Sequence, residues 1–128
     1  MIKIFISQPM RGCTDEEILA VREKAEEDLV NYFEKRYYDG LTNEHEFQFI
    51  SSFFKDGDIE IPNVKNKSMY CLGRSLQLLA DADYIYFCPG WSEARGCRAE
   101  KYIALNYGNI KLLYFNEVMA ERMLNDRK

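Results

Sequence analysis

Residues 84–100 of this chain read YIYFCPGWSEARGCRAE, and this stretch decides the fold. Its first four residues are apolar, which is typical of a short buried strand. A loop containing Pro89 and Gly90 follows, and a helix is expected to begin near Gly96, with Glu100 one turn inside it. Glycines allow a ligand to approach the backbone closely, and the free N–H groups at a helix start attract anions. The stretch therefore predicts a strand, a ligand-binding loop and a helix that carries a carboxylate.

The alternation of strand and helix runs through the whole chain. Strands are expected at 1–6, 47–54, 83–88 and 110–115. Helices are expected after Thr14, around 69–79, at about 96–107 and at 117–126. Short apolar strands that alternate with helices favour a parallel sheet, because right-handed crossovers place helices on both of its faces. The sequence predicts one α/β domain over residues 1–128, a flavodoxin- or Rossmann-like three-layer sandwich with a parallel sheet of four strands, or five.

Two helix ends carry local signals. Residues 14–17, Thr-Asp-Glu-Glu, match the capping box. In this motif the hydroxyl group of Thr14 accepts the backbone N–H of Glu17, and the Glu17 carboxylate accepts the backbone N–H of Thr14. Apolar residues then recur at spacings of three and four from Ile18 to Phe33, so this amphipathic helix is expected to end near Lys35. Gly108 is expected to end the third helix, at the C′ position where glycine is favoured.

Length, charge and composition exclude several classes of protein. The chain has 128 residues and a net charge of −4, whereas extended binding to nucleic acid usually needs a basic face. No apolar run approaches the roughly 20 residues of a membrane span, and the start lacks the charged and apolar regions of a signal peptide. We therefore expect a cytoplasmic protein that binds neither nucleic acid nor membranes.

The cysteines and the single histidine do not form a metal-binding pattern. No CxxC pair occurs, and His45 is the only histidine. We expect neither a metal site nor a cofactor. Without a secretion signal, the thiols are expected to be reduced. The four cysteines are Cys13, Cys71, Cys88 and Cys97.

Ligands of open α/β sheets bind outside the carboxyl ends of the strands. This rule brings residues 7–12, 51–54 and 89–100 to one edge of the sheet. Glu100 is the candidate catalytic residue, because a carboxylate one turn into a helix after a glycine loop is well placed to meet a ligand. The polar segment 55–67 is expected to be a lid or a linker within the domain. The candidate substrate-binding residues are Ser7, Gln8, Met10, Arg11, Gly12, Ser75, Gly90, Trp91, Ser92, Arg95, Gly96 and Cys97.

Several of these residues also have a purely structural interpretation. Trp91 either packs on the third helix or stacks on the ligand. Cys97 is favoured as a small buried side chain over a nucleophile. Ser75 is favoured as a hydrogen-bonding residue of a helix over an activated nucleophile, because no histidine lies near it in sequence. Arg11 either caps the following turn or contacts the ligand, and Arg95 is either a surface charge or a phosphate contact.

Three blocks of the sequence occur together: IFISQPMRG (4–12) with TDEEI (14–18), LGRSL (72–76), and residues 82–91 with Gly96, Cys97 and Glu100. Together they resemble the nucleoside 2-deoxyribosyltransferase-like superfamily, in particular its small, often phage-borne branch known as DUF4406. The resemblance spans most of residues 1–109. It implies the same α/β fold, a nucleoside or nucleotide as the ligand, and a homo-oligomer, most simply a dimer, in which a neighbour completes the pocket.

The resemblance also implies roles for single residues. In the characterised transferases a glutamate attacks the anomeric carbon of the sugar, the base leaves, and another base or water completes the reaction. The segment Gly96–Glu100 is similar to the motif that carries this glutamate, so Glu100 is implied as the nucleophile. The Arg11-Gly12 turn is similar to one that holds a 5′-phosphate in related nucleotide N-hydrolases. The chain departs from the pattern at Ser75 and Ala94, where relatives carry acidic or other catalytic groups.

Two classes of function follow from this comparison. The first is an enzyme that hydrolyses or exchanges the N-glycosidic bond of a nucleoside or a 5′-nucleotide. The second is a protein that binds and sequesters a nucleotide-derived ligand without turnover, which the missing acids favour. A narrower version of the enzyme hypothesis follows from Pro89-Gly90 and Gly96–Glu100, which are similar to the motif of phosphoribohydrolases that release cytokinin bases. This similarity would restrict the substrate to nucleoside monophosphates.

Overall fold

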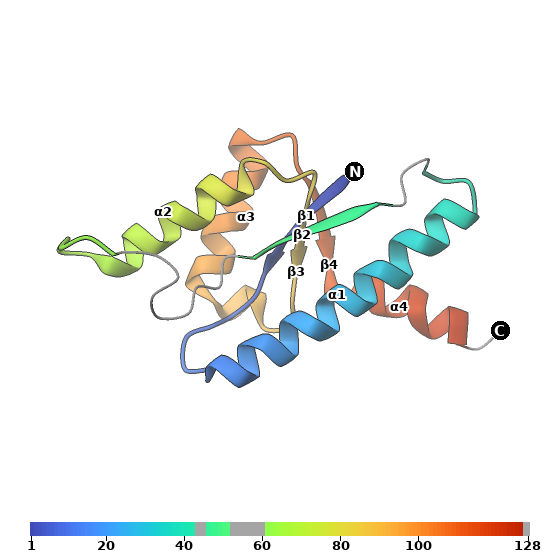
Figure 1. Ribbon diagram of the computed structural model, residues 1–128, viewed down its shortest axis with the longest axis horizontal. Helices are drawn as coiled ribbons and strands as arrows, with labels where there is room; N and C mark the ends of the chain where they lie inside the picture. Colours follow the sequence, from blue (N-terminus) through green and yellow to red (C-terminus); the bar gives the residue numbers. More distant parts are fainter. Residues whose placement is uncertain (43–45, 52–60, 127–128) are drawn as a thin grey trace.

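The chain folds around a four-stranded parallel sheet (Figure 1). The computed structural model describes residues 1–42, 46–51 and 61–126. The strands, in the spatial order β2-β1-β3-β4, are β1 (Ile2–Ser7), β2 (Phe47–Ser51), β3 (Tyr84–Phe87) and β4 (Lys111–Tyr114). The predicted α/β fold with four parallel strands is confirmed, and no fifth strand occurs within the described residues. Residues 52–54 of the expected second strand and 55–60 of the expected lid lie outside them.

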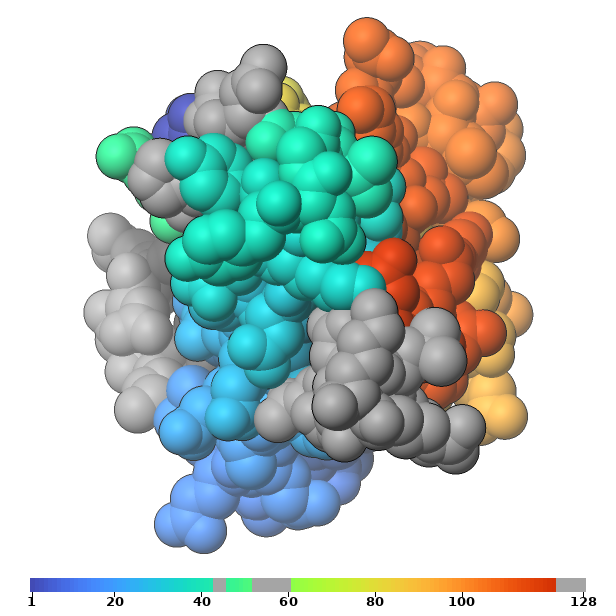
Figure 2. Space-filling view, turned by 90° about the vertical axis from the view of Figure 1, so that its right-hand side faces the viewer, coloured from blue at the N-terminus to red at the C-terminus, as the bar shows by residue number. Residues whose placement is uncertain are grey.

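Helices cover both faces of the sheet and complete the predicted three layers (Figure 1). One face carries α1 (Asp15–Tyr38) and α4 (Phe115–Asp126). The other face carries α2 (Lys67–Leu79) and α3 (Arg95–Tyr107), which the short 3-10 helix η1 (Trp91–Glu93) precedes. Figure 2 shows the last turns of α1, in teal, beside α4, in red-orange. There Arg36 Nη1 lies 3.4 Å from Glu121 Oε1, so an ion pair joins the two helices.

Each face of the sheet has its own core, because successive side chains of a strand point to opposite sides. The core under α1 and α4 includes Ile4, Ile6, Leu29, Phe33 and Val118. The core under α2 and α3 includes Phe5, Leu79, Ile85, Phe87 and Ala104. Ser7, two residues after Phe5, is fully buried and points to the same face. The last residue of β1 therefore presents its hydroxyl group to α3.

Helix α1 begins with the predicted capping box. Thr14 Oγ1 accepts the Glu17 N–H, and the Thr14 N–H donates to Glu17 Oε1, both at 3.1 Å. The helix continues past the expected end near Lys35, as far as Tyr38. Its buried residues are Ile18, Ala25, Asp28, Leu29 and Phe33.

As predicted, Gly108 directly follows the last residue of α3, Tyr107. Its backbone is extended, with φ −115° and ψ 158°, and is not left-handed. A Cβ at this position would lie 3.0 Å from Ile110 Cδ1 and 3.3 Å from the Ala104 carbonyl oxygen. A side chain at this position would press on Ile110 and on the end of α3, so the close return of the chain favours glycine. Sequence spacing alone does not reveal this contact.

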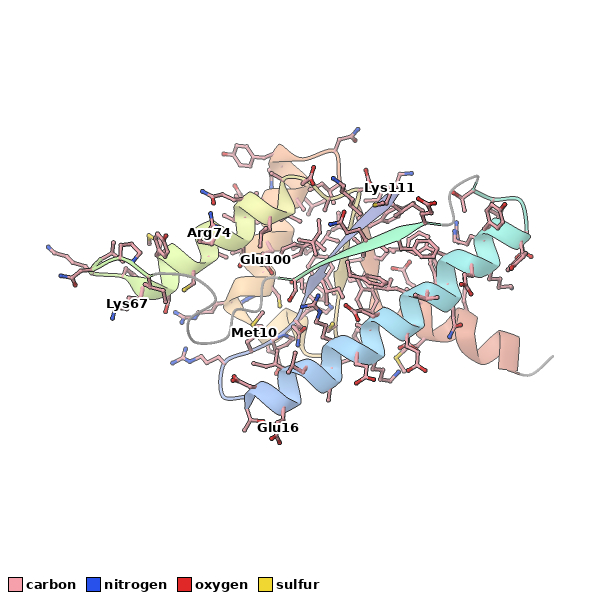
Figure 3. All side chains as sticks on the ribbon, in the orientation of Figure 1. Met10, Glu16, Lys67, Arg74, Glu100 and Lys111 are labelled. Atoms are coloured by element: carbon pink, nitrogen blue, oxygen red, sulfur yellow. The ribbon has the colours of Figure 1, made fainter. Side chains whose placement is uncertain are left out.

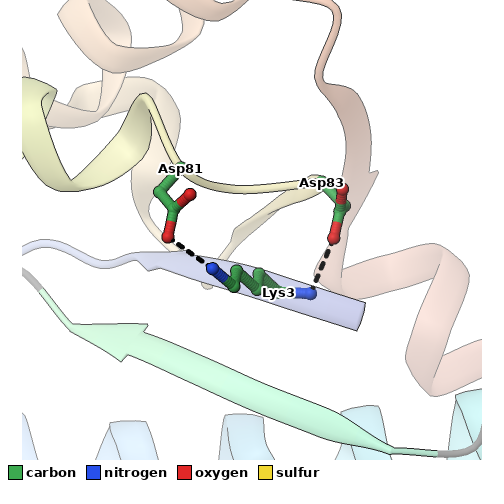
Figure 4. Close-up of polar contacts among 3 residues, drawn as sticks. All are labelled: Lys3, Asp81 and Asp83. Carbon is green, nitrogen blue, oxygen red and sulfur yellow. Dashed lines mark hydrogen bonds and ion pairs between the residues drawn. The ribbon is translucent and has the colours of Figure 1, made fainter. Parts of the chain in front are cut away.

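At the amino edge of the sheet, Asp83 joins three strands (Figure 4). Its carboxylate accepts the backbone N–H of Lys3 at 2.9 Å, and its own N–H donates to the Lys3 carbonyl at 2.8 Å. Its carbonyl accepts the N–H of Lys111 at 3.0 Å. Lys3 Nζ also lies 2.6 Å from the carboxylate of Asp81, whose side chain is 71% exposed. The backbone contacts of Asp83 thus help to fix the register of β1, β3 and β4.

Replacing Asp83 is expected to cost more stability than replacing Asp81. Asp83→Ala leaves the Lys3 N–H without its charged acceptor, so the free energy of unfolding should fall by about 1 kcal/mol. Asp81→Ala removes only an exposed ion pair, for which we expect about 0.5 kcal/mol or less. Urea unfolding of the two variants measures both values, and an equal or smaller loss for Asp83→Ala would contradict this account of the edge.

Candidate functional site

A cavity of about 950 Å³ opens at the carboxyl edge of the sheet. It is lined by residues 8–11, which follow β1, by side chains between Asn66 and Ser75 of α2, and by much of 89–100. These segments lie far apart in sequence, and the parallel topology brings them to one place, as the rule for such sheets predicts. The Arg11 turn and Glu100 therefore share one cavity.

The carboxyl group of Glu100 lies at the buried end of this cavity. Glu100 is 5% exposed, and Ser7 Oγ donates a hydrogen bond to its Oε1 at 2.7 Å. Figure 3 shows Glu100 between α2 and the loop that carries Met10. Among the described residues, Ser7 is the only hydrogen-bond partner of this carboxyl group. Its second oxygen has no hydrogen-bond partner within these residues.

Burial sets the charge of Glu100. Removal from water disfavours the carboxylate and raises its pKa to about 7, although the hydrogen bond from Ser7 acts in the opposite direction. The group is therefore close to half ionised at neutral pH. A buried carboxyl group whose pKa lies near the working pH is typical of a functional site.

Cys97 lies one turn before Glu100 and lines the same cavity. It is 2% exposed, and burial raises the pKa of its thiol to about 11, so the thiolate is scarce at neutral pH. Burial raises the pKa of the neighbouring Cys88 to about 12. Both side chains are small buried groups, which agrees with the interpretation favoured for Cys97.

The start of α3 is open toward the cavity. Ala94 is the N-cap residue and offers no side-chain hydrogen bond to the first turn of the helix. A Cβ on Gly96 would meet no atom within 4 Å, so the fold itself leaves room there. Gly90, in contrast, has φ +86°, and a Cβ on it would lie 3.3 Å from Pro9 Cγ. The loops after β1 and β3 are thus in close contact beside the unblocked helix start.

Four of the expected ligand contacts, Ser7, Gly12, Trp91 and Ser92, do not line the cavity. Ser7 is fully buried and contacts Glu100 instead. The Trp91 ring packs on Phe87 and Tyr114, at centroid distances of 5.1 and 5.3 Å, and Lys101 Nζ lies 4.8 Å above it. Ser92 is exposed in η1. Gly12 has φ +80° and closes a turn in which the Cys13 N–H donates to the Met10 carbonyl. Trp91 anchors its loop to the sheet, and a ligand contact of these residues stays a prediction.

The remaining expected contacts do reach the cavity. Gln8, Met10, Arg11, Ser75, Gly90, Arg95, Gly96 and Cys97 line it. Arg11 and Arg95 are exposed, so they lie at its rim. Ser75 is buried, and its hydroxyl donates to the Cys71 carbonyl at 3.2 Å, as a helix residue would.

Residues near the start of α2 also line the cavity and were not anticipated. Met69, Leu72, Leu76 and Leu79 recur at spacings of three and four and form an apolar stripe on one face of α2. Leu79, at the far end of that stripe, is 1% exposed, whereas Met69 is 67% exposed. The apolar stripe extends past the sheet and becomes a wall of the cavity. The apolar stripe of α2 is longer than the short strands that it covers, and this difference in length is the sequence signal that would have identified the cavity wall.

Comparison with known protein families, with curated proteins and with solved structures finds no match to this chain. The family resemblance and the dimer that it implies therefore stay predictions. No helix in the described part of the chain is long and apolar enough to cross a membrane. Within the same residues, no three His, Cys, Asp or Glu side chains gather in a way that would hold a metal ion.

Glu100→Gln is expected to remove a pH dependence of stability. The pKa of Glu100 in the folded protein, about 7, exceeds its ordinary value of 4.5. The protonated Glu100 therefore contributes its full stabilisation below pH 4.5, and this stabilisation is lost as the pH rises through 7. Relative to the variant, the wild type should lose about 3 kcal/mol of unfolding free energy over this window. Urea unfolding at pH 4.5, 6 and 8 measures it.

Glu93→Gln is the matched control, because Glu93 lines the same cavity but is exposed. Its pH dependence should follow that of the wild type. Parallel curves for the wild type and Glu100→Gln would show that the burial of Glu100 does not perturb its titration.

Proposed function

We propose that the protein binds a nucleoside or nucleotide in this cavity and hydrolyses or exchanges its N-glycosidic bond, with Glu100 as the nucleophile. The observation that carries the proposal is the buried carboxyl group of Glu100, which lines the cavity and is held through one oxygen by Ser7. A carboxylate in such a position suits attack on an anomeric carbon, because it stabilises the positive charge that develops on the sugar.

The reaction requires no group beyond the ligand, water and Glu100. The Glu100 carboxylate forms a bond to the anomeric carbon as the C–N bond breaks, and the base leaves with the electron pair and takes a proton from water. A second water then attacks the same carbon, breaks the ester bond, restores the carboxylate and releases a proton. An incoming base in place of this water gives exchange.

The surroundings of Glu100 suit the other parts of such a ligand. Arg11 and Arg95 lie at the rim, next to the unblocked start of α3, and favour a phosphate or another anionic group at that end. Met69 and Leu72 offer an apolar wall on the α2 side, and thioethers contact aromatic rings favourably. A phosphate near α3 and a base against α2 would place the sugar between them, beside Glu100.

Glu100→Gln is expected to lower kcat/KM for base release by about 10³-fold or more, because the neutral amide is a poor nucleophile. In the wild type the rate should rise with pH through about 7, as the carboxylate forms. Chromatography of a panel of nucleosides and nucleoside monophosphates, with and without added free bases, measures release and exchange. Glu117→Gln, an exposed residue of α4 on the other face of the sheet, is the control. Equal rates in wild type and Glu100→Gln would reject the assignment.

Gly96→Ala tests whether the open start of α3 holds the ligand. No atom lies within 4 Å of the added methyl group, and alanine is the better helix former, so the unfolding free energy should stay level or rise by up to about 1 kcal/mol. Ligand binding should weaken at least about tenfold, because the methyl group occupies the space of the anionic end. Isothermal titration calorimetry and thermal unfolding separate the two effects. Unchanged affinity would place the ligand away from this helix.

Binding without turnover is the second candidate function. The positions that carry catalytic groups in the resembled family hold Ala94 and Ser75, and the Ser75 hydroxyl is already bonded to its own helix. A ligand recovered unaltered from a tight complex by mass spectrometry would support sequestration. Recovery of free base and sugar would exclude it.

A further inference from the structure

Five basic side chains around the rim of the cavity have no partner in the described part of the chain. All five are exposed, and none forms an ion pair, a side-chain hydrogen bond or a contact with an aromatic ring there. They come from the loop after β1, from the start of α2 with the residues just before it, and from the first turn of α3. Residues of each of these segments line the cavity. These rim cations are Arg11, Lys65, Lys67, Arg95 and Arg98.

The other basic side chains that the structure describes all have a partner. Five of them form ion pairs, two lie over aromatic rings, and one donates a hydrogen bond to a glutamine. In this order they are Lys3, Arg22, Lys24, Lys35 and Arg36, then Lys101 and Lys111, then Arg74. The unpartnered cations of the described chain are therefore gathered around one cavity and are not scattered over the surface.

Few acidic residues lie among the rim cations. Among the described residues that line the cavity, the acids are Glu93, which is exposed, and Glu100, which is buried. The whole chain has a net charge of −4, so the positive charge of the rim is local. Like charges that gather in this way repel one another, and they attract an anion to the cleft that they surround.

The rim cations also extend over a greater length than one phosphate group. Both Glu100 and Ser75 line the cavity, and Lys67 precedes Ser75 by eight residues of α2. At the rise of an α-helix these eight residues span about 12 Å. Figure 3 shows Lys67 at the outer end of α2, farther from the sheet than Glu100. A sugar beside Glu100 with a single phosphate would not reach this end of α2, whereas a chain of phosphates would approach it.

We propose that the site takes a nucleoside 5′-polyphosphate, with its chain of two or more phosphate groups lying along the rim cations from the first turn of α3 toward the start of α2. The assignment rests on the proposed function, because it takes the sugar to be bound beside Glu100. Phosphate oxygens accept charge-assisted hydrogen bonds from arginine and lysine side chains. Affinity is therefore expected to rise with the number of phosphate groups.

Inorganic phosphate, pyrophosphate and tripolyphosphate test the rim without knowledge of the base. Isothermal titration calorimetry on the wild type, at one ionic strength, should show tripolyphosphate binding at least about tenfold more tightly than phosphate. The double variant Lys65→Gln/Lys67→Gln should reduce this gain to about threefold or less. The matched control is Lys35→Gln/Lys111→Gln, which removes the same charge from two lysines that do not line the cavity and should keep the gain.

Equal affinities of the wild type for the three anions overturn the proposal without any variant, so a folding defect in the double variant leaves it testable. A gain that both double variants lose equally reflects attraction to the whole protein, and also overturns it. Single-stranded oligodeoxythymidylate that displaces tripolyphosphate and binds more tightly through Lys65 and Lys67 overturns it in favour of a nucleic-acid surface.

The release of base separates this proposal from the proposed function. Nucleoside triphosphates should be cleaved with about tenfold higher kcat/KM than the monophosphates of the same bases. Glu100-dependent release without this gain overturns the polyphosphate assignment and leaves the glycosidic reaction in place. Tight binding of polyphosphates without any release of base supports the assignment of the rim and rejects the reaction.

Discussion

The hydrogen bond from Ser7 to Glu100 joins the central strand to the helix that begins at the cavity. It fixes one oxygen of a carboxyl group that is 5% exposed and lines the cavity. A single neutral donor does not compensate for the loss of hydration, and the pKa of Glu100 rises to about 7 as a result. The fold therefore carries an unfavourable buried group at the carboxyl edge of its sheet. Proteins commonly retain such local conflicts at functional sites.

The other walls of the cavity are formed where the strands end and where helices α2 and α3 begin. The strands are short, whereas the apolar stripe of α2 continues to Met69, beyond the part that covers the sheet. Helix α3 begins without a side-chain cap, and the loop before it is held on the sheet by Trp91. Apolar surface, free backbone N–H groups and a buried carboxyl group thus occur side by side where no further element covers them in the described chain. This combination suits a ligand with anionic, polar and aromatic parts.

Local sequence patterns predicted the architecture well, because each pattern acts over a few residues. The capping box at Thr14 and the apolar run at 84–87 form as expected, and the rule for parallel sheets brings Arg11 and Glu100 together. The surroundings of Trp91 and Gly108 could not be predicted in this way. The position of the Trp91 ring depends on Tyr114, and the room for a side chain at Gly108 depends on Ile110 and Ala104. Such packing contacts are settled only when the tertiary structure forms.

The burial that makes the charge of Glu100 costly suits the proposed catalysis better than simple binding. A neutral sugar placed against the carboxylate leaves its charge uncompensated, so ground-state binding gains little from ionisation. Positive charge that develops on the sugar as the C–N bond breaks would interact strongly with the carboxylate, because the surrounding dielectric is low. An interaction that strengthens only in the transition state accelerates the reaction without tightening substrate binding. A site evolved solely to sequester a nucleotide would gain more from a neutral hydrogen-bonding residue at position 100.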